Sequence, residues 1–313
     1  MNSNLTTKVY LNNLKEDWII DRLRKEWYQS NNEISTNNLL SSNIVWLIAP
    51  WSTNVIVNQA IKVKKTLCSI YHIDEEKFDK KSKNEFFKRD QYVDHYHVIS
   101  KNTEKQLTSL TSKKISSLPF WINEKIFFEI TDREKLKNEL GIPANKYIIG
   151  SFQRDSEGSD TTKPKLSKGP DQFLEIIKNF QSDKKDVHIL LSGRKRDYII
   201  NNLTELKIPY TYFEMVDLNK LNKLYNCLDL YIVASRVEGG PQAILECGIT
   251  KTPIISTNVG IASEILHKES IFDMTNFLSA KPNVDFAFAN TSKFTMQNSF
   301  LKYTNLLKEI VES

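Results

Sequence analysis

The stretch "LDLYIVASRVEGGPQAILECG", residues 228–248, joins an apolar run to a second apolar segment through a Gly-Gly-Pro turn. A continuous apolar run bounded by turn residues predicts a strand buried on both faces. Gly239 and Gly240 let other groups approach the backbone closely, and Pro241 suits the first turn of a helix. The stretch therefore predicts a strand, a turn and a helix, the repeating unit of α/β proteins with parallel sheets.

The same alternation continues on both sides of this stretch. Between residues 146 and 267, apolar runs such as "KYIIGSF" and "DVHILLSG" alternate with amphipathic segments, and the first 125 residues show a shorter series. A chain of 313 residues exceeds the usual size of one core. We predict two doubly wound, Rossmann-like domains: residues 1–127, completed by a C-terminal helix at 293–313, and residues 128–292.

Composition excludes several classes of protein. Hydrophobic residues make up 40% and charged residues 26%, which favours a globular chain over a disordered one. Residues 1–125 hold 19 Lys and Arg against 14 Asp and Glu, and thus carry the whole net charge of +5. Basic clusters there would suit phosphates, anionic lipid or nucleic acid, but solvated helix faces explain them better. We expect no nucleic-acid partner, because no recognised module interleaves aromatic and basic residues.

The cysteines and the apolar pattern bear on location. Cys68, Cys227 and Cys247 each lie in an apolar run, and we interpret them as buried thiols rather than zinc ligands or disulfides. No run of about 18 apolar residues is present, and the first residues do not resemble a signal peptide. The sequence predicts a cytoplasmic protein.

Two carboxylates flank the Gly-Gly-Pro turn with seven residues between them. Ligands bind parallel sheets where strands end and helices begin, and helix-start amides suit an anion such as a phosphate. Glu238 precedes the turn, whereas Glu246 lies about one and a half turns into the helix, where it can accept hydrogen bonds from a vicinal diol such as a ribose. The alternative is that Glu238 caps the helix and Glu246 is a surface residue.

The segment "EGGPQAILE" resembles the E-x(7)-E signature of the retaining glycosyltransferase family 4, and the flanking residues 221–266 are similar to the family's pattern. The resemblance implies the GT-B fold, two facing Rossmann-like domains with a cleft between them, and a nucleotide-sugar donor held mainly by the second domain. It implies that Glu238 contacts the donor sugar and Glu246 the ribose hydroxyls. The backbone of Gly239, Gly240 and Pro241 would meet the sugar.

The segment "GSFQRDSEGSDTTKPKLSKGPDQFLEII", residues 150–177, is similar to a stretch in which an Arg and a Lys bracket the pyrophosphate. The resemblance assigns these roles to Arg154 and Lys168. The loop between them is longer than usual in the family, so Lys163 and Lys165 compete with them, and a solvated Lys-rich loop is the alternative.

Further ligand contacts are implied by position in the family pattern. Met215 and Val216 would contact the base, although a plain loop explains them equally well. Gly260 would admit a phosphate. Glu264 would accompany the sugar site, or else form a surface salt bridge.

The first domain would supply the acceptor site. His72 resembles a T-x-H position near the donor sugar, and a structural histidine is the alternative. His95 and His97 have metal-like i, i+2 spacing, but without a third ligand we interpret them as packing residues. The family's Gly-Gly loop after the first strand is missing, and the side chains of residues 15–18 (Lys15, Glu16, Asp17 and Trp18) would replace it.

We therefore predict a retaining glycosyltransferase that moves a sugar from a UDP- or GDP-sugar to a hydroxyl of a glycan, a lipid or a protein-linked saccharide. Glu238, Arg154, Lys168 and His72 form the predicted catalytic set. No cofactor or metal is expected, since no Asp-x-Asp motif is present. The expected partners are a nucleotide sugar and a saccharide or glycolipid acceptor, with peripheral membrane contact compatible with the basic first domain. The alternatives are a sugar-nucleotide epimerase, a phosphorylase, or a non-catalytic binding subunit.

Overall fold

The computed structural model describes residues 6–13, 19–158, 160–182 and 186–313, so residues 15–18 lie outside the described part of the chain. The chain divides into two compact units: Met1–Trp121 with Gln297–Ser313, and Ile122–Met296. From the sequence we predicted that the chain passes between the two domains at 127/128 and 292/293, whereas the two units meet at 121/122 and 296/297. The crossing segments pair with each other inside the second unit, because the Ile122 amide donates to the Phe294 carbonyl (2.8 Å) and the Met296 amide to the Ile122 carbonyl (3.0 Å).

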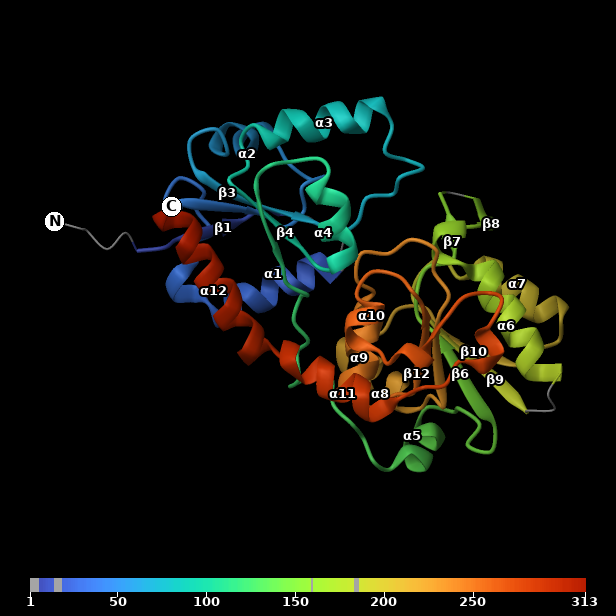
Figure 1. Ribbon diagram of the computed structural model, residues 1–313. Helices are drawn as coiled ribbons and strands as arrows, with labels where there is room; N and C mark the ends of the chain where they lie inside the picture. The colour runs from blue at the N-terminus through green and yellow to red at the C-terminus, as the bar shows by residue number, and fades with distance from the viewer. Residues whose placement is uncertain (1–5, 14–18, 159, 183–185) are drawn as a thin grey trace. The chain divides into compact units, whose positions relative to one another are not determined.

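The first unit has a parallel five-stranded sheet with its strands in sequence order (Figure 1). The strands are β1 (Val9–Leu11), β2 (Ile44–Leu47), β3 (Lys65–Ile70), β4 (His95–Val98) and β5 (Lys114–Ser117). One face is covered by α2 (Val55–Ala60), α3 (Lys80–Asp90) and α4 (Lys101–Thr108), and the other by α1 (Ile19–Ser30) and α12 (Met296–Glu312). Segment 74–90, which the sequence left open between helix and loop, thus contains a helix.

Successive side chains of a strand point to opposite faces of the sheet, so the core of the first unit has one part on each face. Val45 and Leu47 of β2 pack in one cluster with residues of α2, α3 and α4. Trp46, between them, points to the other face, where its ring lies 5.3 Å from that of Trp27 in α1 and 5.2 Å from that of Tyr303 in α12. Burying large aromatic rings contributes most of the hydrophobic stabilisation at such positions. The C-terminal helix is therefore part of the first unit's core.

The second unit has a parallel six-stranded sheet in the order β10-β9-β6-β11-β12-β13. The strands in chain order are β6 (Tyr147–Ser151), β9 (Val187–Ser192), β10 (Tyr210–Phe213), β11 (Leu230–Val233), β12 (Ile254–Thr257) and β13 (Ile271–Phe272). The chain runs outward from β6 to β10 and then returns to β11 beside β6. This reversal is the topological position at which open α/β sheets bind ligands.

Helices cover both faces of the second sheet (Figure 1). One face carries α6 (Pro170–Ser182) and α7 (Asp197–Glu205). The other carries α5 (Arg133–Glu139), α8 (Leu218–Asn226), α9 (Gln242–Ile249), α10 (Ala262–Ile265) and α11 (Val284–Thr291). Among the described residues, no helix combines the length and the apolar character needed to cross a bilayer.

The connection from β6 to α6 contains structure that the sequence did not indicate. Where a polar loop was expected, β7 (Ser156–Glu157) and β8 (Asp160–Pro164) form an antiparallel hairpin. The Lys165 amide closes its base by donating to the Asp155 carbonyl (2.7 Å). The hairpin sets the spacing between Arg154 and Lys168.

Candidate functional site

Two connections of the second unit touch at the carboxyl edge of β6 and β11. Gly169, at the start of α6, has a left-handed φ of 61°, and a Cβ on it would lie 1.7 Å from the Ala234 carbonyl oxygen. Only glycine fits there. The amides of Arg236 and Val237 donate to the Ser167 carbonyl (2.9 and 3.1 Å), which fixes the connection after β6 against the one after β11.

A third connection, after β12, supports the Gly239-Gly240 turn. Gly260 has a φ of 51°, and a Cβ there would lie 2.2 Å from the Gly239 carbonyl oxygen. The Thr257 hydroxyl donates to the Ser235 carbonyl (2.6 Å). Within the described parts of the chain, the amides of Gly239 and Gly240 donate to no protein group. Gly239 is buried and Gly240 half-buried, and these two amides are the candidates for backbone hydrogen bonds to a ligand.

Lys168 and Glu238 form an ion pair across this junction, although 70 residues separate them in sequence. Ser235 also donates to Oε1 of Glu238 (3.3 Å), and the Gln153 side chain donates to the Lys168 carbonyl (2.8 Å). Both charged groups are half-buried, so water screens them less than it screens a surface pair. The junction brings the predicted lysine and the first predicted glutamate together.

Glu238 does not cap α9, which was the alternative interpretation. Pro241 occupies the N-cap position without a side-chain hydrogen bond to the helix, and α9 begins at Gln242. Because the Glu238 carboxylate accepts from Lys168 and Ser235, it is directed to the junction.

Arg154 follows β6 and is half-buried. Among the described residues, its Nε has no hydrogen-bond partner. The next residue is fixed: the carboxylate of Asp155 lies 3.0 Å from Nε of Arg196, and both side chains are almost fully buried. Burial raises the pKa of Asp155 to about 6, and the charge of Arg196 opposes that rise. The pair anchors the backbone beside Arg154, whose own Nε is left without a partner among the described residues.

A strained residue completes this anchor. Lys195 has a φ of 58°, unusual for a residue with a side chain. In this conformation its carbonyl accepts from the amides of Asp155 (3.1 Å) and Ser156 (3.3 Å) and from the Ser156 hydroxyl (2.8 Å). Sequence reasoning missed the contribution of Lys195 and Arg196, since no local pattern links positions about 40 residues apart.

Glu246 is buried, with only 4% of its surface exposed, so the alternative of a surface residue is wrong. The Tyr225 hydroxyl in α8 donates to its Oε2 (2.7 Å). Burial, and then the charge of Glu246, raise the pKa of Tyr225 well above its usual range, so this phenol keeps its proton. The carboxylate is thus held in a fixed orientation by a neutral donor.

The remaining predicted residues lie elsewhere. Met215 and Val216 follow β10, with β9 and β6 between that strand and β11; Met215 is exposed and Val216 half-buried. Lys163, on the hairpin, is 75% exposed and lies 3.6 Å from Asp160. His72 is exposed after β3, in the first unit.

The two paired histidines belong to the first sheet. His97 contacts the Ser69 hydroxyl (2.8 Å), the Leu118 carbonyl (2.7 Å) and the Tyr303 hydroxyl (3.0 Å), and burial lowers its pKa to about 4. His95 contacts the Ser116 hydroxyl (2.9 Å). In the described part of the chain, no three His, Cys, Asp or Glu side chains gather as metal ligands would.

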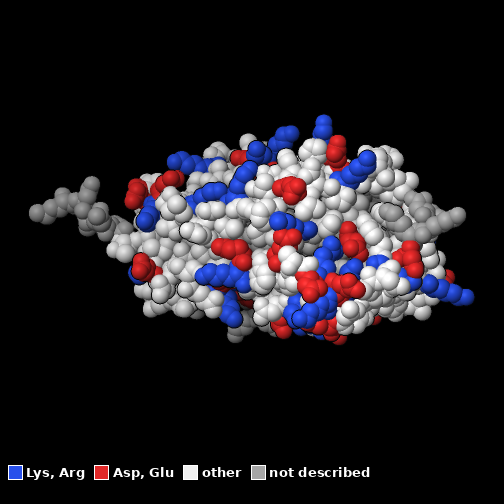
Figure 2. Space-filling model, turned by 90° about the horizontal axis from the view of Figure 1, so that it is seen from below, with Lys and Arg blue, Asp and Glu red and all other residues white. Residues whose placement is uncertain are grey.

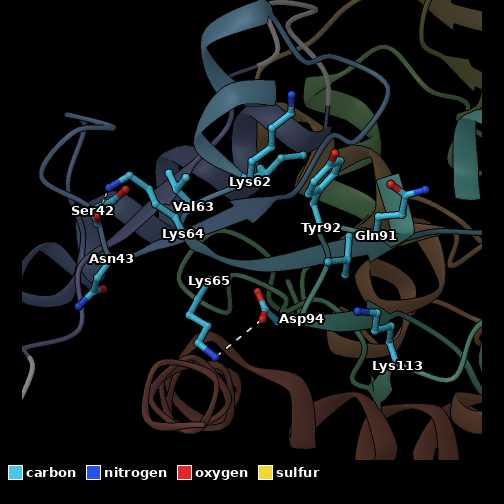
Figure 3. A pocket seen from close by; sticks show the side chains of 12 residues that line it. Ser42, Asn43, Lys62, Val63, Lys64, Lys65, Gln91, Tyr92, Asp94 and Lys113 are labelled. Carbon is cyan, nitrogen blue, oxygen red and sulfur yellow. Dashed lines mark hydrogen bonds and ion pairs between the residues drawn. The ribbon is translucent and has the colours of Figure 1, made fainter. Parts of the chain in front are cut away.

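A hollow of about 590 Å³ lies at the amino edge of the first sheet, lined by four lysines (Figure 3). Lys64 donates to the carbonyls of Leu40 and Ser42, Lys65 lies 3.8 Å from Asp94, and Lys62 lies 5.7 Å from the Tyr92 ring centroid. Lysines at this edge compensate the negative ends of helices. Basic and acidic side chains are interspersed on the face shown in Figure 2. We assign no ligand to this hollow.

Comparisons with known proteins agree with the fold. HepE of Anabaena, solved in complex with UDP and glucose, superposes with a TM-score of 0.74 at 11% identity, over 97% of this chain and 100% of that chain. Sucrose-phosphate synthase of Thermosynechococcus elongatus gives 0.69 at 13% identity, over 96% and 80%. The pneumococcal O-GlcNAc transferase GtfA, in complex with UDP and GlcNAc, gives 0.67 at 12% identity, over 86% and 57%.

These likenesses establish the GT-B fold of two Rossmann-like domains. No curated protein sequence matches the chain. Residues 132–306, more than half of the chain, match the family described as glycosyl transferases group 1. The chain therefore belongs to the group 1 glycosyltransferase family.

Proposed function

We propose that this protein transfers a sugar, with retention of configuration, from a nucleoside-diphosphate sugar to a hydroxyl acceptor. The observation that carries the proposal is the junction of Lys168, Glu238 and the bare Gly239-Gly240 amides at the strand-order reversal. Departure of a nucleoside diphosphate develops negative charge. Fixed cations and amides at that position stabilise the transition state more than the ground state.

On this proposal, different residues contact the diphosphate and the donor sugar. Lys168 and Arg154 hold the diphosphate, Lys168 as a point charge and Arg154 as a fork for two oxygens. Glu238 contacts the donor sugar, next to the Gly239, Gly240 and Pro241 backbone. We assign no side-chain nucleophile, because the leaving phosphate can take the acceptor proton.

The rest of the donor has contacts of its own. Glu246, oriented by Tyr225, accepts from the ribose hydroxyls. Met215 and Val216 contact the base. His72 donates to the donor sugar from the first unit. Neither a cofactor nor a metal takes part on this proposal.

The donor is a UDP-sugar or a GDP-sugar, and two of the similar structures hold UDP. The acceptor is a hydroxyl of a glycan, a lipid or a protein-linked saccharide, with contact at a membrane surface where the acceptor is a glycolipid. Sugar transfer takes place in the cytoplasm. The three buried, free cysteines suit that reducing compartment.

A donor-hydrolysis assay with matched variants tests the proposal. The protein is incubated with UDP-glucose, UDP-N-acetylglucosamine or GDP-mannose, with and without EDTA, and released nucleoside diphosphate is measured. We expect Lys168→Ala to lower turnover about 10²- to 10³-fold, as loss of one charge-stabilising donor does. Lys163→Ala, which removes a solvated lysine of the same connection, should leave it within about twofold.

Other outcomes discriminate the alternatives. Equal effects of the two lysine substitutions would refute the diphosphate assignment. A new sugar nucleotide without diphosphate release indicates an epimerase. Turnover that requires inorganic phosphate indicates a phosphorylase, and donor binding without turnover under any acceptor indicates a binding subunit. Inversion at the anomeric carbon, measured by NMR of the first product, would contradict retention.

A further inference from the structure

Trp51 is an exposed tryptophan in a chain whose other described tryptophans are buried. It lies on the connection between β2 and α2, at the carboxyl edge of the first sheet, where parallel sheets bind ligands. Its side chain is 56% exposed, whereas Trp27, Trp46 and Trp121 are 0% exposed. An exposed aromatic ring at such an edge indicates a binding surface more strongly than scattered apolar residues do.

The structure holds this connection rigidly. The buried Asn12 side chain donates to the carbonyls of Ala49 (2.7 Å) and Ser52 (2.8 Å) and accepts from the Ala49 amide (3.0 Å). These three hydrogen bonds fix the backbone on both sides of Trp51. Because the Asn12 amide is hydrogen-bonded through both its nitrogen and its oxygen, its burial carries little penalty and the loop keeps one conformation.

An aromatic column supports the Trp51 ring from below. Its centroid lies 5.4 Å from that of Tyr71, whose ring stacks at 5.6 Å on Phe120. Tyr71 is tied in place, because its hydroxyl donates to the Ile48 carbonyl (2.8 Å). Phe120 in turn stacks on Trp46 in the core. The Trp51 ring meets Tyr71 edge-on, at an interplanar angle of 68°, and is the outermost of these linked rings.

The connection that carries Trp51 is uncharged. Residues 48–61 contain no charged side chain. Val55 and Ile56, on the first turn of α2, are 75% and 66% exposed, and His72 follows Tyr71 at the same sheet edge. A nucleotide or an anionic bilayer would call for basic groups here. A pyranose ring presents a face of C–H groups to an aromatic ring, whose face is negative.

We infer that Trp51 is the stacking platform for the acceptor and that the acceptor is a neutral saccharide; the acceptor role rests on the proposed function, whereas saccharide binding by Trp51 stands without it. Trp51 then determines acceptor affinity and takes no part in donor activation. Tyr71 and Asn12 are positioning residues for the platform.

Intrinsic fluorescence tests the binding step. The wild-type chain is titrated with cellobiose, lactose, maltose and N,N′-diacetylchitobiose. At least one saccharide should give a saturable change that is lost in Trp51→Phe and kept in Trp18→Phe, which removes the tryptophan outside the described residues. If none of the four changes the fluorescence of Trp51, the inference is wrong.

Kinetics test the role in transfer, using the saccharide that binds. Trp51→Ala should raise the acceptor KM about tenfold to a hundredfold, as loss of a buried aromatic anchor does. Trp51→Phe should retain most affinity, and acceptor-free donor hydrolysis should be the same in all variants. Tyr92→Ala, which removes an exposed aromatic ring at the opposite sheet edge, is the control.

The outcomes separate this inference from the proposed function. Absence of donor hydrolysis in the wild type would refute the proposed function. The fluorescence titration would still measure saccharide binding at Trp51. An unchanged acceptor KM in Trp51→Ala would overturn the platform. The platform would also be overturned if the chain bound phosphatidylcholine vesicles through Trp51 while no saccharide changed its fluorescence. That result would assign the surface to lipid.

Discussion

Gly169→Ala is the sharpest test of the junction between β6 and β11. The substituted methyl would lie 1.7 Å from the Ala234 carbonyl oxygen, whereas ordinary van der Waals contact begins near 3.4 Å. The two backbones must therefore separate by about 1.7 Å, the difference between these distances. That movement pulls on the hydrogen bonds from Arg236 and Val237 to the Ser167 carbonyl.

The size of the effect follows from three contributions. A non-glycine residue in the left-handed region costs about 1 to 2 kcal/mol. Each of the two strained hydrogen bonds contributes about 0.5 to 1.5 kcal/mol. Their sum is about 2 to 5 kcal/mol, and its midpoint, about 3.5 kcal/mol, should lower Tm by roughly 7 to 14 °C in a unit of this size. Lys168 is the neighbouring residue, so donor turnover should fall as well.

Gly141→Ala is a matched control. Gly141 has nearly the same φ, 66°, but nothing lies within 4 Å of its Cβ position. It should lose only the conformational contribution of about 1 to 2 kcal/mol, and donor turnover should be unchanged. Thermal unfolding by circular dichroism and the diphosphate-release assay measure both variants. If the two substitutions lower Tm equally, the close contact between Gly169 and Ala234 is not a feature of the folded protein.

Three further predictions concern the turn, the anchor and the first sheet. Gly260→Ala, whose methyl would lie 2.2 Å from the Gly239 oxygen, should raise the donor KM about tenfold and, because Gly260 has a left-handed φ of 51°, should also cost about 1 to 2 kcal/mol of stability; an unchanged donor KM would place the donor elsewhere. Arg196→Met leaves the Asp155 carboxylate buried and unpaired, so urea unfolding should show a loss of about 3 to 5 kcal/mol, and adding Asp155→Asn should recover part of it; no recovery would contradict an ion pair. Burial lowers the pKa of His97 from 6.5 in the unfolded chain to about 4. The contribution of this neutral histidine to the free energy of unfolding is therefore fully present above pH 6.5. It is lost on acidification toward pH 4, by up to about 1.4 kcal/mol per pH unit. His97→Gln should remove that contribution from the pH dependence of urea unfolding, and an identical slope in the variant would contradict it.

The regular elements of the second unit could be predicted because their signals are local. Strands such as β9 and β11 are continuous apolar runs, and the helices between them have apolar residues at helical spacing. The β7–β8 hairpin has no such signal, since its residues are polar and Lys195, about 40 positions away, holds it. The crossing at residue 122 was hidden for a related reason: Ile122 continues the apolar run of the first unit, but its backbone pairs with the second.

The site was predictable as a set of residues and not as an arrangement. Turn chemistry and family resemblance indicated Lys168, Glu238 and the two glycines. Their meeting depends on β6 and β11 being neighbours, which is a property of strand order. Helical spacing placed Glu246 on α9, but its burial against Tyr225 depends on how α8 packs beside that helix. A contact between two distant elements leaves no recognisable pattern in the sequence of either segment.

The pairing of Lys168 with Glu238 bears on how a donor would be held. In this structure Glu238 neutralises the lysine, so the pair alone offers a diphosphate little net charge. On the proposed function, the diphosphate replaces Glu238 as the counter-charge of Lys168, and the released carboxylate becomes an acceptor for sugar hydroxyls. Arg154, which has no carboxylate partner among the described residues, supplies positive charge throughout the exchange. The same two side chains thus hold the junction together before the donor binds and contact opposite ends of its glycosidic bond afterwards.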